Sequence, residues 1–144
     1  MLNTIRHILQ VKGWDTWFVR PDSSVFEALK QMADREIGAL LVMEGDHLVG
    51  IFSERDYARK VILKGKASKD TPVAEIMTST VFTIHPDQTV QEAMELMTEK
   101  HVRHLPVVEG DKVIGMVSIG DVVRSIIYQQ KKIISEMENK IISG

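Results

Sequence analysis

The sequence predicts a mixed α/β fold in which two βαββα units pack with pseudo-two-fold symmetry, followed by a long C-terminal helix. Three observations predict it. The 144-residue chain matches itself without a gap from position 21 to 56, at an offset of 121 − 56 = 65 residues, which indicates two copies of one supersecondary unit. The string G-apolar-apolar-S-x-x-D occurs twice in it, at 50–56 and 115–121. Apolar residues recur at helical spacing from 122 to 142.

The elements of the first copy follow from its turn and capping signals. We expect a short strand ending near Val19, and then a helix opened by the capping box of Ser24 and Glu27. Apolar runs at 39–43 and up to residue 52, joined by a Glu-Gly-Asp turn, predict a hairpin. A second helix is expected to begin after Ser53.

The second copy repeats this order. We expect a strand ending at 82–84, a helix opened by Thr89 and Glu92, strands at 105–108 and up to 117, and a helix after 118. The polar stretch 64–70 indicates a linker, so the predicted repeats are residues 1–68 and residues 69–144 with the C-terminal helix. A short helix is expected at 71–77, with residues 5–9 as its counterpart and 13–15 as an inserted turn. We expect the last helix to break near Gln130.

Composition limits the classes of function. The chain is 44% hydrophobic and 26% charged, which suits one compact module. A net charge of −2 disfavours a nucleic-acid partner, which usually meets a basic excess. The chain has no cysteine, which excludes disulfides, thiolate metal sites and a catalytic cysteine. Because no apolar run approaches membrane-spanning length, we expect no membrane partner and a cytoplasmic location.

The repeated S-x-x-D string has two readings, a helix cap and a ligand site. The serine side chain can accept from free backbone N–H groups at the start of a helix, and the acid suits the positive end of the helix dipole. The same corner attracts phosphate, and an ionised aspartate can accept from both hydroxyls of a ribose. A single copy favours the cap, whereas two copies inside a longer repeat favour the ligand.

Four strings resemble the cystathionine-beta-synthase (CBS) domain family, as a stand-alone CBS pair or Bateman module. They are V-A-E-I-M-T at 73–78, G-I-F-S-E-R-D-Y at 50–57, R-H-L-P-V-V at 103–108 and G-M-V-S-I-G-D at 115–121. The resemblance implies two clefts for adenosine-containing ligands: AMP, ADP, ATP, NAD or S-adenosylmethionine. It also implies a regulatory or sensor role toward a partner protein, with no enzymatic activity and no required cofactor.

The resemblance also implies site residues. Asp121 and Asp56 would hold the ribose, with Ser118 and Ser53 beside them. Phosphate would meet Arg55 in one copy, and Gly120, Arg103 and His104 in the other. The ligand-binding residues expected for the Asp121 cleft are Asp121, Ser118, Arg103, His104, Gly120, Met116, Ile37, Gly38 and Trp17. Those expected for the Asp56 cleft are Asp56, Ser53, Arg55, Phe82 and Val102.

The clefts are expected to be unequal. A phosphate dianion beside His104 favours the protonated imidazole and raises its pKa, so ligand binding at the Asp121 cleft should weaken as the pH rises through that raised value. The other cleft depends on Arg55, which stays charged at any usable pH.

Several alternatives remain open. Ser118, His104 and Asp121 have the residue types of a hydrolase triad, which would make the chain a nucleotide hydrolase. His101 and His104 are three residues apart, a spacing that suits metal ligation, but a strand would separate their faces, and we predict no metal. A structural dimerisation module with empty clefts is the third alternative. The apolar pairs of 122–142 exceed what one small core needs, which predicts a homodimer.

Overall fold

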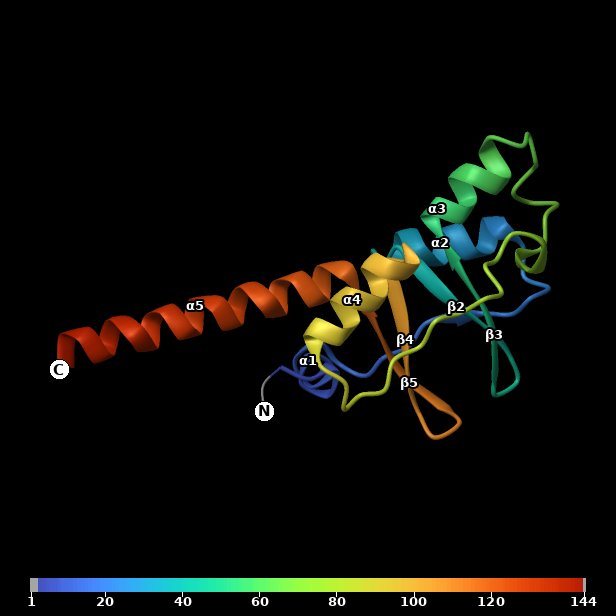
Figure 1. The fold of residues 1–144 in the computed structure, drawn as a ribbon. Helices are drawn as coiled ribbons and strands as arrows, with labels where there is room; N and C mark the ends of the chain where they lie inside the picture. Colours follow the sequence, from blue (N-terminus) through green and yellow to red (C-terminus); the bar gives the residue numbers. More distant parts are fainter. Residues whose placement is uncertain (1–2, 144) are drawn as a thin grey trace. The chain divides into compact units, whose positions relative to one another are not determined.

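The computed structural model describes residues 3–143, and they divide into two compact units (Figure 1). Residues 16–82 form the first-repeat unit, and residues 3–15 with 83–143 form the second-repeat unit. The predicted mixed α/β fold with a long C-terminal helix is confirmed.

The first-repeat unit contains a three-stranded sheet in the order β1-β2-β3. β1 (Phe18–Val19) pairs in parallel with β2 (Ala39–Glu44), and β2 pairs antiparallel with β3 (His47–Ser53). α2 (Val25–Arg35) connects β1 to β2, α3 (Glu54–Tyr57) follows β3 directly and continues into the π-helical turn η1 (Ala58–Ile62), and η2 is a single 3₁₀ turn (Val73–Glu75).

The sequence explains where α2 begins and how it packs. The Ser24 hydroxyl accepts from the backbone N–H of Glu27, as the capping signal predicted, and the helix ends where Glu36 adopts a left-handed conformation. Val25, Ala28 and Met32 lie on the buried face. That face joins a core of buried residues from the sheet, η1 and η2: Val19, Leu40, Val42, Phe52, Val61, Val73 and Ile76.

The second-repeat unit contains the hairpin of β4 (His104–Glu109) and β5 (Lys112–Ser118), with α1 (Ile5–Lys12), α4 (Val90–Lys100) and α5 (Ile119–Ser143). Thr89 and Glu92 form the predicted capping box at the start of α4. The first strand expected in this copy is reduced to one parallel bridge between Ile84 and Val107. The predicted break near Gln130 is wrong, because α5 is continuous and its central residues include no glycine or proline.

The segment that precedes each repeat in sequence packs with the other repeat. The backbone N–H of Val25 donates to Thr71 O at 2.9 Å, and that of Val90 donates to Asn3 O at 2.7 Å. Residues 71–77 and 3–9 are therefore counterparts, as expected. However, α1 belongs to the second-repeat unit although it precedes the first repeat in sequence, so the compact units do not follow the 68/69 boundary of the sequence repeats.

This crossed packing gives the motif glycines their role. A Cβ on Gly50 of β3 would lie 2.6 Å from Sδ of Met77, and a Cβ on Gly115 of β5 would lie 2.8 Å from the Cδ atoms of Leu9. Only glycine lets these segments cross the strands so closely. The crossing brings Thr78 to the end of β3, where it contacts Asp56, and it brings Lys12 to the end of β5, where it contacts Asp121.

Candidate functional site

Asp121 lies where β5 passes into α5, in the second-repeat unit. The backbone N–H of Ser118 donates to Oδ2 of Asp121 at 2.8 Å, and the N–H of Asp121 donates to the Ser118 hydroxyl at 3.2 Å. These reciprocal bonds satisfy two backbone donors at the start of the helix. The helix-cap reading of the S-x-x-D string is therefore confirmed, and it fixes the orientation of the carboxylate.

Two cations hold the same carboxylate. Nζ of Lys12, from α1, lies 2.7 Å from Oδ2 and also donates to the carbonyl oxygen of Met116 at 2.8 Å. A terminal guanidinium nitrogen of Arg124 lies 2.7 Å from Oδ1. The side chain of Asp121 is only 8% exposed. Burial raises the pKa of Asp121, but the hydrogen bonds from Lys12 and Ser118 outweigh burial and keep the pKa below its ordinary value.

Asp56 has an equivalent setting at the junction of β3 and α3, in the first-repeat unit. Its Oδ2 accepts from the N–H and the hydroxyl of Ser53, both at 3.0 Å. Its Oδ1 accepts from the hydroxyl of Thr78 at 3.0 Å and lies 3.1 Å from Nζ of Lys60. Lys60 also donates to the carbonyl oxygen of Ile76 at 3.0 Å. In both units, therefore, a lysine ammonium bridges the motif carboxylate and a backbone carbonyl.

His104 is the first residue of β4 and pairs with Ser118 across the hairpin. It is half-buried. Burial lowers the pKa of His104 most, and Lys12 lowers it further; Asp121 opposes them with a smaller effect, and Arg103 adds the smallest lowering. The imidazole is therefore neutral at pH 7. Arg103 is exposed, and its carbonyl oxygen accepts the N–H of Ile119 at 2.8 Å.

The remaining expected site residues are spread over both units. Trp17 packs against the core of the first-repeat unit, and the guanidinium of Arg35 lies 3.5 Å from the centroid of its ring. Arg55 is exposed in the first turn of α3, and Phe82 and Val102 are half-buried. Because Trp17, Ile37 and Gly38 belong to the other unit from Asp121, and Val102 to the other unit from Asp56, these groupings stay predictions.

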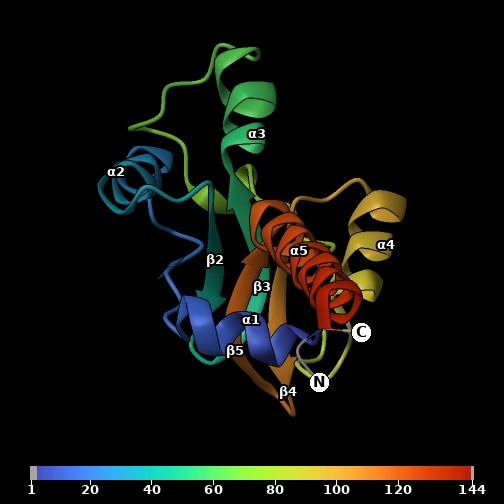
Figure 2. The same cartoon turned by 90° about the vertical axis from the view of Figure 1, so that its left-hand side faces the viewer.

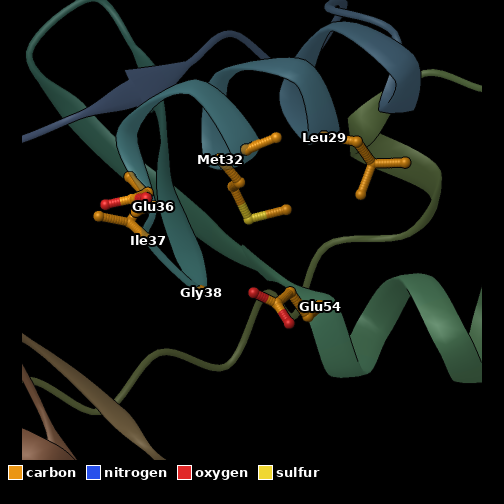
Figure 3. A pocket seen from close by; sticks show the side chains of 7 residues that line it. Leu29, Met32, Glu36, Ile37, Gly38 and Glu54 are labelled. Carbon is orange, nitrogen blue, oxygen red and sulfur yellow. The ribbon is translucent and has the colours of Figure 1, made fainter.

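Ile37 and Gly38 line a cavity of about 350 Å³ in the first-repeat unit (Figure 3). Leu29 and Met32 of α2 form one wall, and Glu54 lies across from them at the start of α3. Glu36 and Glu54 give the cavity two carboxylates, so it would repel a phosphate.

Sequence reasoning missed four residues that contact the motif acids: Lys12, Lys60, Thr78 and Arg124. Helical spacing could have found Lys60, four residues after Asp56, and Arg124, three residues after Asp121. Nothing in the repeat pattern points to Lys12, because Lys12 lies 109 residues before Asp121 in sequence.

The histidines considered as metal ligands lie on different elements. His101 ends α4 in a left-handed conformation, and His104 begins β4. Among the described residues, metal-ligating atoms of His85, Asp87 and Glu109 lie within 4.8 Å of one another, and all three residues are exposed. Arg6 already binds this group, since its guanidinium contacts Asp87 at 3.0 Å and Glu109 at 2.7 Å. The group is a surface ion-pair cluster.

Comparison with known proteins gives consistent matches. The model of a family described as the CBS domain matches residues 14–63 and 73–128. The mitochondrial CBS domain-containing protein CBSX3 of Arabidopsis thaliana is 39% identical over 150 residues, covering 98% of this chain and 73% of the plant protein. The crystal structure of the CBS domain protein NE2398 is 50% identical with a TM-score of 0.83, covering 86% of this chain and 97% of that one.

A third match carries ligands. The CBS domain pair of protein MJ0100 was solved in complex with 5′-methylthioadenosine and S-adenosyl-L-methionine. It is 27% identical to this chain with a TM-score of 0.77, and the match covers 89% of this chain and 97% of that one.

Proposed function

Because the chain belongs to the CBS domain family, and carries a pair of these domains that forms a regulatory module, we propose that it binds an adenosine-containing ligand and signals to a partner protein. The observation that carries the proposal is the repeated site chemistry. Each repeat holds one buried, oriented carboxylate, Asp56 or Asp121, against a lysine ammonium.

A ribose fits this arrangement by exchange. Its two hydroxyls can donate to a carboxylate oxygen, as the ammonium does now, and they can also accept from a nearby donor. The side chains of Lys12 and Lys60 are 42% and 43% exposed, so each ammonium can move from the carboxylate into the adjacent water. The carboxylate stays oriented, because the capping bonds from Ser118 and Ser53 hold it independently of the lysine.

The displaced lysine is then free to meet a phosphate. On the Asp121 side, Lys12, Arg124, Arg103 and His104 supply positive charge or donors, and on the Asp56 side Lys60 and Arg55 do so. Charge-assisted bonds to phosphate are stronger than neutral ones. Because His104 is neutral at pH 7 without a ligand, it contributes charge only where a bound phosphate raises its pKa.

The candidate ligands are AMP, ADP, ATP, NAD and S-adenosylmethionine. The two molecules bound to the MJ0100 pair both contain an adenosine moiety and no phosphate. What they share with the nucleotides is the ribose that the motif aspartates would bind. The ligand acts here as a signal, and no cofactor is required.

The proposal includes a homodimer and a regulated partner protein that the ligand would control. No helix within the described part of the chain is both long and apolar enough to span a bilayer. A cytoplasmic location stays a prediction, since the name of the plant relative places that protein in mitochondria.

The contacts of Ser118 do not favour the nucleotide-hydrolase alternative. The Ser118 hydroxyl accepts the N–H of Asp121, and Asp121 binds Lys12 and Arg124. A catalytic triad would need the histidine between the serine and the acid.

Calorimetric titration of the wild-type chain with AMP, S-adenosylmethionine and ribose 5-phosphate, with inorganic phosphate as the control, tests the proposal. We expect both adenosine ligands to bind and inorganic phosphate to bind far more weakly, because the ribose contact is lost. Absence of heat with every adenosine ligand, including ATP and NAD, would support the ligand-free dimerisation module instead. Steady release of phosphate from ATP would support the hydrolase.

A further inference from the structure

The distal half of α5 is an apolar surface without a partner in its own unit. Within the second-repeat unit, α5 extends well beyond α1 and α4 (Figure 1), and Figure 2 shows it from its C-terminal end. Every residue from 130 to 142 is exposed. They include Ile134, Met137 and Ile141, which are 54%, 61% and 81% exposed. Large apolar side chains gathered on one exposed helix indicate an interaction surface.

The spacing of these residues is that of a coiled coil. Ile127, Ile134 and Ile141 are seven residues apart, and Val123, Gln130 and Met137 alternate with them at steps of three and four. This is the a and d pattern of a heptad, with isoleucine at every a position. Ile133, at a g position and 55% exposed, borders this seam on one side, and Lys131 and Glu138, at e positions, border it on the other.

The charges that flank this seam identify the partner. We infer that α5 pairs antiparallel with α5 of a second copy of this chain. Ile134 of each copy packs against Met137 of the other. That register sets Lys131 beside Glu138 of the second copy, and Glu138 beside its Lys131, because both lie at e positions and e meets e in an antiparallel pair. In a parallel pair, Lys131 would face Ile126 and Glu138 would face Ile133, so no charges would be matched.

A membrane surface fits this helix less well. Residues 130–142 carry three lysines and two glutamates, so the polar face lacks the basic excess that attracts anionic lipid. The inference rests on the homodimer of the proposed function and deepens it by naming its surface. It does not depend on which ligand binds.

Sedimentation velocity over a range of concentrations tests the surface. Ile134→Asp places a charge in the seam, and Ser135→Asp places the same charge one residue away on the outer face of the helix. Because both positions are exposed, neither change should unfold the chain, and circular dichroism checks this. We expect I134D to raise the dimer dissociation constant at least tenfold and S135D to leave it within about twofold.

The outcomes separate the two proposals. A wild-type chain that stays monomeric at about 50 μM overturns the homodimer together with this surface. A wild-type dimer that I134D does not weaken overturns the surface and leaves the homodimer standing. A weakened I134D dimer that still binds AMP like the wild type supports the surface and shows that the fold is intact.

A charge exchange tests the orientation. Lys131→Glu or Glu138→Lys alone would set like charges together and raise the dissociation constant several-fold, whereas the double variant K131E/E138K would restore the wild-type value. A parallel pair, or a partner other than a second copy, predicts no rescue by the double variant. That result would overturn the antiparallel arrangement.

Discussion

At the residue scale, the lysines on the motif acids decide how a ligand enters. Lys12 occupies the Asp121 oxygen that the proposed ribose needs and is itself a candidate phosphate group. Removing the lysine should therefore have opposite effects on the affinities of two ligands. The affinity for adenosine should rise because no ammonium has to be displaced, and the affinity for AMP should fall because AMP loses a charge-assisted bond.

We predict that Lys12→Met lowers the ratio of AMP affinity to adenosine affinity about tenfold, as expected for one charge-assisted hydrogen bond. Competition calorimetry with both ligands measures this ratio. Lys132→Met, on the exposed part of α5, is the matched control and should leave the ratio unchanged. An unchanged ratio in K12M would show that Lys12 plays no part in binding.

His104 predicts a pH dependence of stability. Its pKa in the folded chain lies below the ordinary value of 6.5, chiefly because of burial. A group with a lowered pKa contributes stability that is fully present above its unfolded pKa and is lost as the pH falls through its folded pKa. The free energy of unfolding of the wild type should therefore fall as the pH drops below about 6.5.

His104→Gln removes this titration. Urea unfolding at pH 7.5, 6.5 and 5.5 should show a shallower fall for H104Q than for the wild type. The four other histidines are the same in both proteins, so they cancel in the comparison. Parallel profiles for the two proteins would contradict the account of His104.

At the element scale, the crossing of residues 73–78 over β3 sets the position of Thr78 beside Asp56. The hydroxyl of Thr78 reaches Asp56 only because Gly50 leaves room for Met77 and for the backbone oxygen of Thr78, which a Cβ would approach to 3.1 Å. The motif glycine thus serves the site through packing.

We predict that Gly50→Ala lowers the free energy of unfolding by about 1–3 kcal/mol, the usual cost of overpacking a tight contact. Chemical denaturation measures it. Gly120→Ala is the control, because the one tight contact of its Cβ would be with the Arg124 side chain, at 3.3 Å, while Oγ of Ser118 would lie at an ordinary contact distance of 3.6 Å. The Arg124 side chain is 72% exposed and can move aside. Equal stability of G50A and the wild type would show that the segment adjusts freely.

At the scale of the whole molecule, the repeat predicted the elements but not their assembly into units. Cap and hairpin signals act within a few residues, so α2, α4 and both hairpins follow from local chemistry. The counterpart role of residues 5–9 was also readable. The packing of α1 with the second repeat could not be predicted, because no spacing along the chain indicates which copy a flanking segment contacts.

The same limit explains the candidate site. Ser53 with Asp56 and Ser118 with Asp121 were found because each pair lies within one helical turn. Lys12 reaches Asp121 only through tertiary packing, so the cation that contacts this carboxylate could not be predicted from the sequence. Burial is likewise the main cause of the lowered pKa of His104, and burial follows from the fold.

Asp56 and Asp121 are proposed to bind one ribose each, and AMP titration of the Asp56→Asn and Asp121→Asn variants tests this most directly. Asparagine keeps an oxygen for the helix cap but loses the charge. We predict two binding events in the wild type, a ten- to hundredfold loss of affinity at one of them in each single variant, about 1.5–3 kcal/mol, and loss at both in the double variant. Titrations of a folded double variant that match the wild type would contradict the claim.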